Sequence, residues 1–123
     1  METEFERAKA AIEAMRIGAA DTEEEIHMQV ARMFENAGLA AEHEVRLAPR
    51  CRIDFMVGAI GVEIKKKRPQ KAALTAQLAR YAACPQVERL LVLAPRGVDL
   101  PNRIGGKTVT MMSLEKLWGI SLP

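Results

Sequence analysis

Two acids and a lysine lie within one short stretch of alternating apolar residues. The stretch covers residues 52–65 and reads Arg-Ile-Asp-Phe-Met-Val-Gly-Ala-Ile-Gly-Val-Glu-Ile-Lys, with Asp54 in its first half and Glu63 and Lys65 in its second. Alternation of this kind predicts two short strands. Gly58, at the first central position of the connection, suits a two-residue hairpin turn of the mirror-image type. Such a hairpin would bring the two acids together across the strands.

The register follows if Val57 pairs with Ile60, since Asp54 then lies directly opposite Glu63. Side chains alternate between the two faces of a strand. One face is therefore predicted to be wholly apolar and to be formed by Ile53, Phe55, Val57, Ile60, Val62 and Ile64. The other face carries the charged residues Asp54, Glu63 and Lys65, beside Met56 and Arg52.

Two carboxylates directly opposite each other need an explanation. Their Cβ atoms are about 5 Å apart in such a pair, and at an effective dielectric near 20 two unit charges at that distance repel by roughly 3 kcal/mol. A divalent cation removes the conflict, because hard cations such as Mg²⁺ bind carboxylate oxygens. Lys65 can reach a phosphate or a water on that metal. The alternatives are a solvated hairpin face with chance acids, or a one-residue register slip that separates the acids.

Length and composition indicate an ordinary globular chain. Its 123 residues predict one domain, residues 1–123, with 49% hydrophobic and 28% charged residues. No apolar run approaches the length of a membrane span, and the N-terminus is acidic where a secretory signal would be basic. Cys51 and Cys84 have neither a disulfide framework nor metal-ligand spacing. We therefore expect free thiols, a cytoplasmic location and no membrane partner.

The net charge of +2 hides an asymmetry along the chain. Residues 1–44 have a balance of −7, whereas residues 45–123 have a balance of +9. The basic part contains the run 65–68, Lys-Lys-Lys-Arg, followed by Lys71. A concentrated positive surface favours phosphate-rich partners, although such a run can also be a solvated strand end. Aromatic residues are few, which argues against a platform that stacks on bases.

The elements that must position these residues can be read from periodicity and breaks. Helices are predicted over residues 2–17, 22–37 and 70–83, and strands over 42–47, 52–57, 60–65, 89–95 and 107–112. Residues 96–106 are read as a loop, and Ser113 could cap a short helix that ends near Trp118. This order predicts an α/β or α+β sheet with helices packed on it.

The second predicted helix carries an acid within its apolar stripe. Glu23 falls inside that stripe and His27 lies at its edge, while Glu24 and Glu25 point elsewhere. A carboxylate on the buried face of a helix end is unusual unless it has a partner. The alternative is an acid that only complements the helix dipole.

These residues resemble the motif of the PD-(D/E)XK nucleases. The family has an acid on the second core strand and Glu/Asp-x-Lys on the third, here Asp54 and Glu63-Ile64-Lys65. Gln77-Leu-Ala-Arg-Tyr81 on the next helix resembles the Gln-x-x-x-Tyr motif of the RecB-type branch. The resemblance covers roughly residues 22–94, and Ile53 replaces the motif proline. It implies a restriction-endonuclease-like α/β core, with elements in the order αβββαβ and a mixed sheet of about five strands.

The resemblance also implies an activity, namely hydrolysis of DNA phosphodiester bonds with Mg²⁺ or Mn²⁺. Asp54, Glu63 and the Ile64 carbonyl would hold the metal, and Glu23 would complete its shell, with Glu25 and His27 as alternatives. Lys65 would orient the attacking water or stabilise the phosphorane. Gln77 would position the substrate strand together with Tyr81. The residues implied in contacts with nucleic acid are Lys66, Lys67, Arg68, Lys71, Arg80 and Tyr81.

Two other functions fit the same sequence. The domain could bind nucleic acid or a partner on a nuclease-like scaffold without catalysis, or it could bind an acidic protein through its basic face. Small proteins of this kind often dimerise, so a homodimer is a candidate assembly. The sequence does not distinguish DNA from RNA or endonuclease from exonuclease activity.

Overall fold

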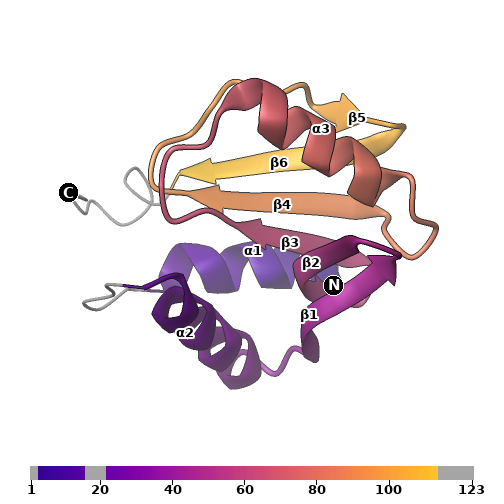
Figure 1. Cartoon of the computed structure of the whole chain (residues 1–123). Helices are drawn as coiled ribbons and strands as arrows, with labels where there is room; N and C mark the ends of the chain where they lie inside the picture. The colour runs from indigo at the N-terminus through magenta and orange to yellow at the C-terminus, as the bar shows by residue number, and fades with distance from the viewer. Residues whose placement is uncertain (1–2, 16–21, 114–123) are drawn as a thin grey trace.

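The computed structural model describes residues 3–15 and 22–113, which form one six-stranded mixed sheet and three helices (Figure 1). The helices are α1 (Glu4–Ala14), α2 (Glu23–Asn36) and α3 (Lys71–Ala82). The strands are β1 (Ala41–Ala48), β2 (Cys51–Val57), β3 (Ile60–Ile64), β4 (Arg89–Ala94), β5 (Arg103–Ile104) and β6 (Lys107–Ser113). The α/β class is thereby confirmed.

The sheet has the strand order β1-β2-β3-β4-β6-β5. β1, β2 and β3 form an antiparallel meander, β4 lies parallel to both β3 and β6, and β5 is antiparallel to β6. Parallel neighbours need a crossover connection, and α3 supplies it between β3 and β4 (Figure 1). No helix within the described residues is both long and apolar enough to cross a membrane.

Helices cover both faces of this sheet. One apolar core joins α1 and α2 to the sheet through residues such as Phe34 and Phe55, and a second joins α3 to the other face through residues such as Leu78 and Leu90. β4 is buried along five of its six residues, which is why its sequence is an uninterrupted apolar run. The sheet therefore separates two cores, and a polar group can enter only at an end or an edge.

Helix starts agree with local capping chemistry. Thr3 and Glu6 form a reciprocal capping box at α1, and the Thr22 hydroxyl accepts from the Glu25 backbone N–H at α2. The observed helices are a little shorter than predicted. The predicted helix after Ser113 lies outside the described residues, whereas Ser113 itself ends β6 and its hydroxyl donates to the Pro95 carbonyl.

The prediction of about five strands was too low by one. β5 consists of two residues, Arg103 and Ile104, inside the segment read as a loop. It pairs with the start of β6 through Arg103–Thr108 and Ile104–Lys107. Two residues are too few for alternation to be visible in a sequence, and the pairing depends on the Gly105–Gly106 turn, where both residues have positive φ.

The register of the β2–β3 hairpin is as predicted at its turn. Val57 pairs with Ile60, and the ladder continues through Met56–Gly61 to Phe55–Val62. Gly58 has φ +60°, a conformation that L side chains rarely adopt. A Cβ at this position would also lie 2.1 Å from Glu4 Oε1. The positive φ of the turn therefore favours glycine here, whereas the exposed Glu4 carboxylate could move away from a Cβ.

The predicted face of Ile53 was wrong. Ile53 packs in the core beneath α3, whereas Phe55 packs in the core beneath α1 and α2. The neighbouring strand changes face at the same level, because Val45 pairs with Ile53 and packs on the α3 side. Glu44, the residue before Val45 on β1, has φ +53°, in the left-handed region. The alternation of both strands thus breaks at the same level of the sheet, beside Glu44 on β1 and at Asp54 on β2.

Candidate functional site

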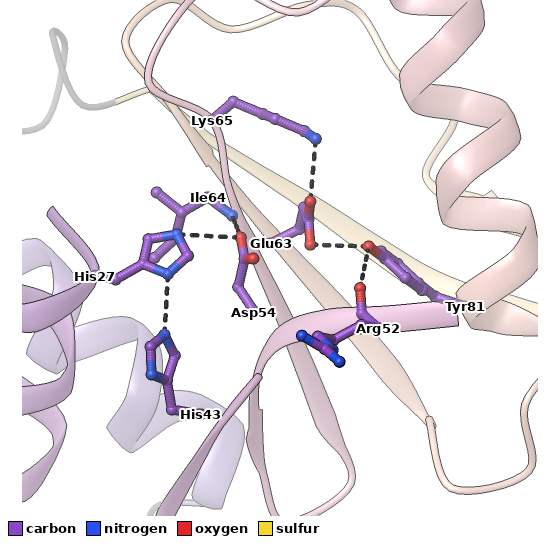
Figure 2. A network of polar contacts seen from close by, with 8 residues as sticks. All are labelled: His27, His43, Arg52, Asp54, Glu63, Ile64, Lys65 and Tyr81. Atoms are coloured by element: carbon purple, nitrogen blue, oxygen red, sulfur yellow. Dashed lines mark hydrogen bonds and ion pairs between the residues drawn. The ribbon is translucent and has the colours of Figure 1, made fainter. Parts of the chain in front are cut away.

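Asp54 lies where the β2–β3 ladder stops. The backbone pairs of the two strands end at Phe55–Val62. Asp54 is the residue before Phe55 on β2. Its Oδ2 accepts a hydrogen bond of 2.7 Å from the Ile64 backbone N–H (Figure 2). A side-chain carboxylate thereby satisfies a backbone donor that a regular ladder would pair. This contact fixes the carboxylate against the end of β3.

Glu63 is held beside it from two sides. The residue is 4% exposed, and its Oε2 forms an ion pair of 3.0 Å with Lys65 Nζ. The Tyr81 hydroxyl lies 3.0 Å from Glu63 Oε1 and 3.0 Å from the Arg52 carbonyl, so its single proton is shared between two acceptors. Figure 2 shows Lys65 above this carboxylate and Tyr81 reaching it from α3.

The pKa of each of the two acids is raised in the folded protein. Burial raises the pKa of Asp54 to about 6, against the lowering effects of the Ile64 N–H and Lys65. Burial also raises the pKa of Glu63, and the charge of Asp54 raises it further. Two neighbouring carboxylates that are desolvated and repel each other form a donor set suited to a hard divalent cation. The chemistry of these residues therefore fits the implied metal.

A cleft of about 600 Å³ opens next to this pair, between the end of β3, the start of α2 and one side of α3. It gathers most of the residues singled out from the sequence, namely Glu23, Lys65, Lys66, Lys67, Arg68, Gln77 and Arg80. Lys71 is exposed on the first turn of α3 and does not line it. A larger hollow of about 870 Å³ lies beside the end of β6. Asp54 and Glu63 line neither hollow, but Lys65, which forms the ion pair with Glu63, lines the smaller cleft.

Tyr81 has a position that its sequence motif did not indicate. Its side chain is 2% exposed and packs in the core beneath α3. Burial and the charge of Glu63 raise the pKa of its hydroxyl well above the usual range. An inward phenol with both of these partners is better placed to orient Glu63 than to contact nucleic acid.

The three candidates on α2 are placed differently. Glu23 lines the cleft, and its charge contributes to the raised pKa of Asp54. His27 is buried, with Nε2 3.6 Å from Asp54 Oδ2. Glu25 is exposed, and its backbone N–H belongs to the helix cap. The structure therefore brings Glu23 and His27 toward Asp54.

One group near the site was not found from the sequence. His27 Nδ1 lies 3.0 Å from His43 Nε2 on β1 (Figure 2), and His43 stacks on Phe55 at a centroid distance of 4.6 Å. His27, His43 and Glu44 each offer one ligand atom, and these atoms lie within 4.8 Å of one another. The available signal was weak, because His43 and Glu44 are adjacent in a strand and regular alternation would point them apart.

Comparison of the chain with protein-family models, with curated proteins and with solved structures finds no match. Functional inference therefore depends on the geometry and chemistry of the residues at the end of β3.

Proposed function

We propose that this protein is a metal-dependent nuclease that hydrolyses DNA phosphodiester bonds at the end of β3. The observation that carries the proposal is the buried Glu63, held between Lys65 and Tyr81 and adjacent to Asp54 at the break in the ladder. The order α2, β1, β2, β3, α3, β4 agrees with the αβββαβ order of a restriction-endonuclease-like core. Fold and site thus support the same class of protein.

The residues that would hold Mg²⁺ or Mn²⁺ are Asp54, Glu63, the Ile64 carbonyl and Glu23. Asp54 Oδ2 already accepts from the Ile64 N–H, which leaves Oδ1 as the oxygen for a cation. When bound, the cation would polarise the phosphate and lower the pKa of an attacking water. Glu23 lines the cleft and would reach the cation directly or through water.

The protein's own residues have separate tasks in this proposal. Lys65 is about one-quarter exposed, so its ammonium group can contact both Glu63 and a phosphate in the cleft. There it would orient the water and stabilise the negative charge that develops on the phosphoryl oxygens. Tyr81 keeps Glu63 Oε1 in place. Gln77 would position the strand, and Lys66, Lys67, Arg68 and Arg80 would bind flanking phosphates.

One observation favours a second candidate, a nucleic-acid-binding module without catalysis. Both oxygens of Glu63 are engaged within the protein, by Lys65 and by Tyr81. If the lysine stays on the acid, it serves as an internal counter-ion in place of a metal. The basic cleft would then bind phosphates without cutting them.

A cleavage assay separates the two candidates. Purified protein is incubated with Mg²⁺ or Mn²⁺ on linear, nicked, branched and single-stranded DNA and on matched RNA. The nuclease proposal expects metal-dependent cleavage that is lost in Glu63→Gln and kept in Glu88→Gln, which changes an acid outside the site. Salt-sensitive binding with no cleavage of any substrate would overturn the nuclease in favour of the binding module.

A further inference from the structure

The ring of His27 faces two different groups with its two nitrogens. Nδ1 lies 3.0 Å from His43 Nε2, and Nε2 lies 3.6 Å from Asp54 Oδ2 (Figure 2). The residue is 7% exposed, and Nε2 is buried without a hydrogen-bond partner in the described part of the chain. A buried polar atom without a partner is costly, so the arrangement is incomplete as it stands.

The backbone of Glu44 explains why two consecutive residues can meet His27. In a regular strand His43 and Glu44 would project from opposite faces. Glu44 instead has φ +53°, which costs a residue with a side chain about 1–2 kcal/mol. This conformation brings its carboxylate within 4.8 Å of the ligand nitrogens of His27 and His43. Strain of this kind persists where surrounding structure and function retain it.

We propose that His27 Nδ1, His43 Nε2 and the Glu44 carboxylate bind a divalent transition-metal ion of the zinc class. Two imidazoles and one carboxylate are the ligand set of an open zinc site, in which a water or a substrate atom takes the fourth position. Imidazole nitrogens favour Zn²⁺ and Co²⁺ over Mg²⁺. The site is half open, because His27 is buried while His43 and Glu44 are exposed.

The remaining nitrogen of His27 then gains a function. With Nδ1 on the metal, the ring proton must lie on Nε2, which faces Asp54 Oδ2. Metal-bound histidines commonly donate their other N–H to a carboxylate, which fixes the tautomer and the ring orientation. Asp54 would be that outer partner, so the proposal accounts for the atom that has none in the described structure.

The competing explanation is a plain hydrogen bond between the two imidazoles. A separation of 3.0 Å suits a proton shared between Nδ1 and Nε2. Two nitrogens on one tetrahedral ion, each at about 2.1 Å, are roughly 3.4 Å apart. The pair therefore needs to open by only a few tenths of an ångström to admit the metal. A hydrogen bond alone also places the ring proton on His27 Nε2, but it gives no reason for the strained backbone of Glu44 or for a third ligand atom beside the two imidazoles.

The test measures metal binding, so it does not depend on the proposed nuclease activity. Tag-free full-length protein is titrated with Co²⁺, followed by its visible absorption, and with Zn²⁺ by calorimetry. With excess Mg²⁺ present to occupy the Asp54–Glu63 pair, we expect one equivalent to bind. His43→Ala and Glu44→Gln should each weaken this binding at least about 10-fold, the scale at which even outer partners of a metal act. Asp54→Asn should weaken it by a similar factor. Glu88→Gln, which changes an exposed acid outside both sites, is the control and should leave it unchanged.

Three outcomes would overturn this second site. Loss of Co²⁺ binding in Glu63→Gln but not in His43→Ala or Glu44→Gln would place the ion on the Asp54–Glu63 pair and leave the nuclease proposal standing. An absorption spectrum with thiolate charge-transfer bands would place it on Cys51 and Cys84. Wild type that binds neither ion would leave the two imidazoles as a hydrogen-bonded pair. Circular dichroism of each variant establishes that a loss of binding is not a loss of fold.

Discussion

The β2–β3 hairpin has two ends of opposite character. At the turn, Val57 and Ile60 form a regular backbone pair and are buried in the core beneath α1 and α2. At the open end, the ladder stops, a carboxylate takes the place of a backbone partner, and Glu63 is buried beside Asp54. The comparison indicates that the turn end supplies stability and register. The open end contains buried acids that lower stability, which suggests that they are retained for function.

The largest expected effect is at the open end. Asp54→Asn keeps an acceptor for the Ile64 N–H but removes the charge, so the fold should remain while cleavage falls by about 10³-fold or more, because a metal supplies several kcal/mol to such reactions. The same change should abolish the rise in melting temperature that Mg²⁺ or Mn²⁺ gives wild type, since a ligand stabilises the state that it binds. Asp99→Asn, in the loop before β5, is the control for cleavage and for melting. Equal metal-induced shifts in wild type and Asp54→Asn would count against a site at Asp54.

The next effect separates catalysis from binding among the basic residues. Lys65→Ala should reduce turnover by about 10²-fold with DNA binding nearly kept, the scale for loss of one transition-state donor. The triple change of Lys66, Arg68 and Lys71 to Ala should weaken binding and lower the salt slope by roughly one unit for each phosphate that the protein no longer neutralises. Turnover at saturating DNA should survive in the triple variant. Normal cleavage by Lys65→Ala, with a triple variant that is inactive at saturation, would reverse these two roles.

A change near the turn end should affect stability alone. A Cβ at Gly61 would lie 2.6 Å from Ile53 Cδ1 and 3.0 Å from Leu90 Cδ2. Gly61→Ala should therefore lower the free energy of unfolding by about 1–3 kcal/mol, as overpacking does, and leave metal affinity unchanged while the protein is folded. Gly97→Ala is a matched control, because its Cβ would be 3.6 Å from the nearest atom, Met111 Cγ. Urea denaturation measures the difference, and equal stabilities of the two variants would show that β3 has more room than the packing indicates.

An effect of similar size is a pH dependence of stability without metal. The pKa of Asp54 is about 6 in the folded protein and about 3.9 in an unfolded chain. A raised pKa gives stability that is fully present below about pH 4 and is lost as the pH rises through about 6. Relative to wild type, Asp54→Asn should therefore gain on the order of 2 kcal/mol between pH 4 and pH 7. Urea denaturation in EDTA across this range tests the sign, and a gain that shrinks with rising pH would contradict it.

The sequence was sufficient where local chemistry determines the structure. The register at Val57–Ile60 follows from Gly58 and from alternation, and the α/β class follows from the order of helical and alternating segments. The face of Ile53 could not be predicted, because the change of face coincides with the left-handed backbone of Glu44 in the neighbouring strand. Alternation within β2 carries no information about that residue.

The candidate site also has residues that the sequence could indicate and residues that it could not. Asp54, Glu63 and Lys65 were recognisable because they are close in sequence and share one hairpin. His43 was missed because its contact with His27 joins positions 16 residues apart through tertiary packing. For Tyr81 the motif spacing identified the residue but not its direction, and only the docking of α3 on the sheet shows that its hydroxyl faces Glu63.

The burial of Tyr81 also affects the ultraviolet absorption of the protein. Tyr81 is the one tyrosine of the chain. Burial and the neighbouring charge of Glu63 hold its pKa above the ordinary value of about 10. Because phenolate absorbs ultraviolet light at longer wavelengths than phenol, an alkaline titration reads this single position without any label. The spectrum should stay that of a phenol until α3 separates from β3, so the protein contains its own indicator of whether the contact between Tyr81 and Glu63 is intact.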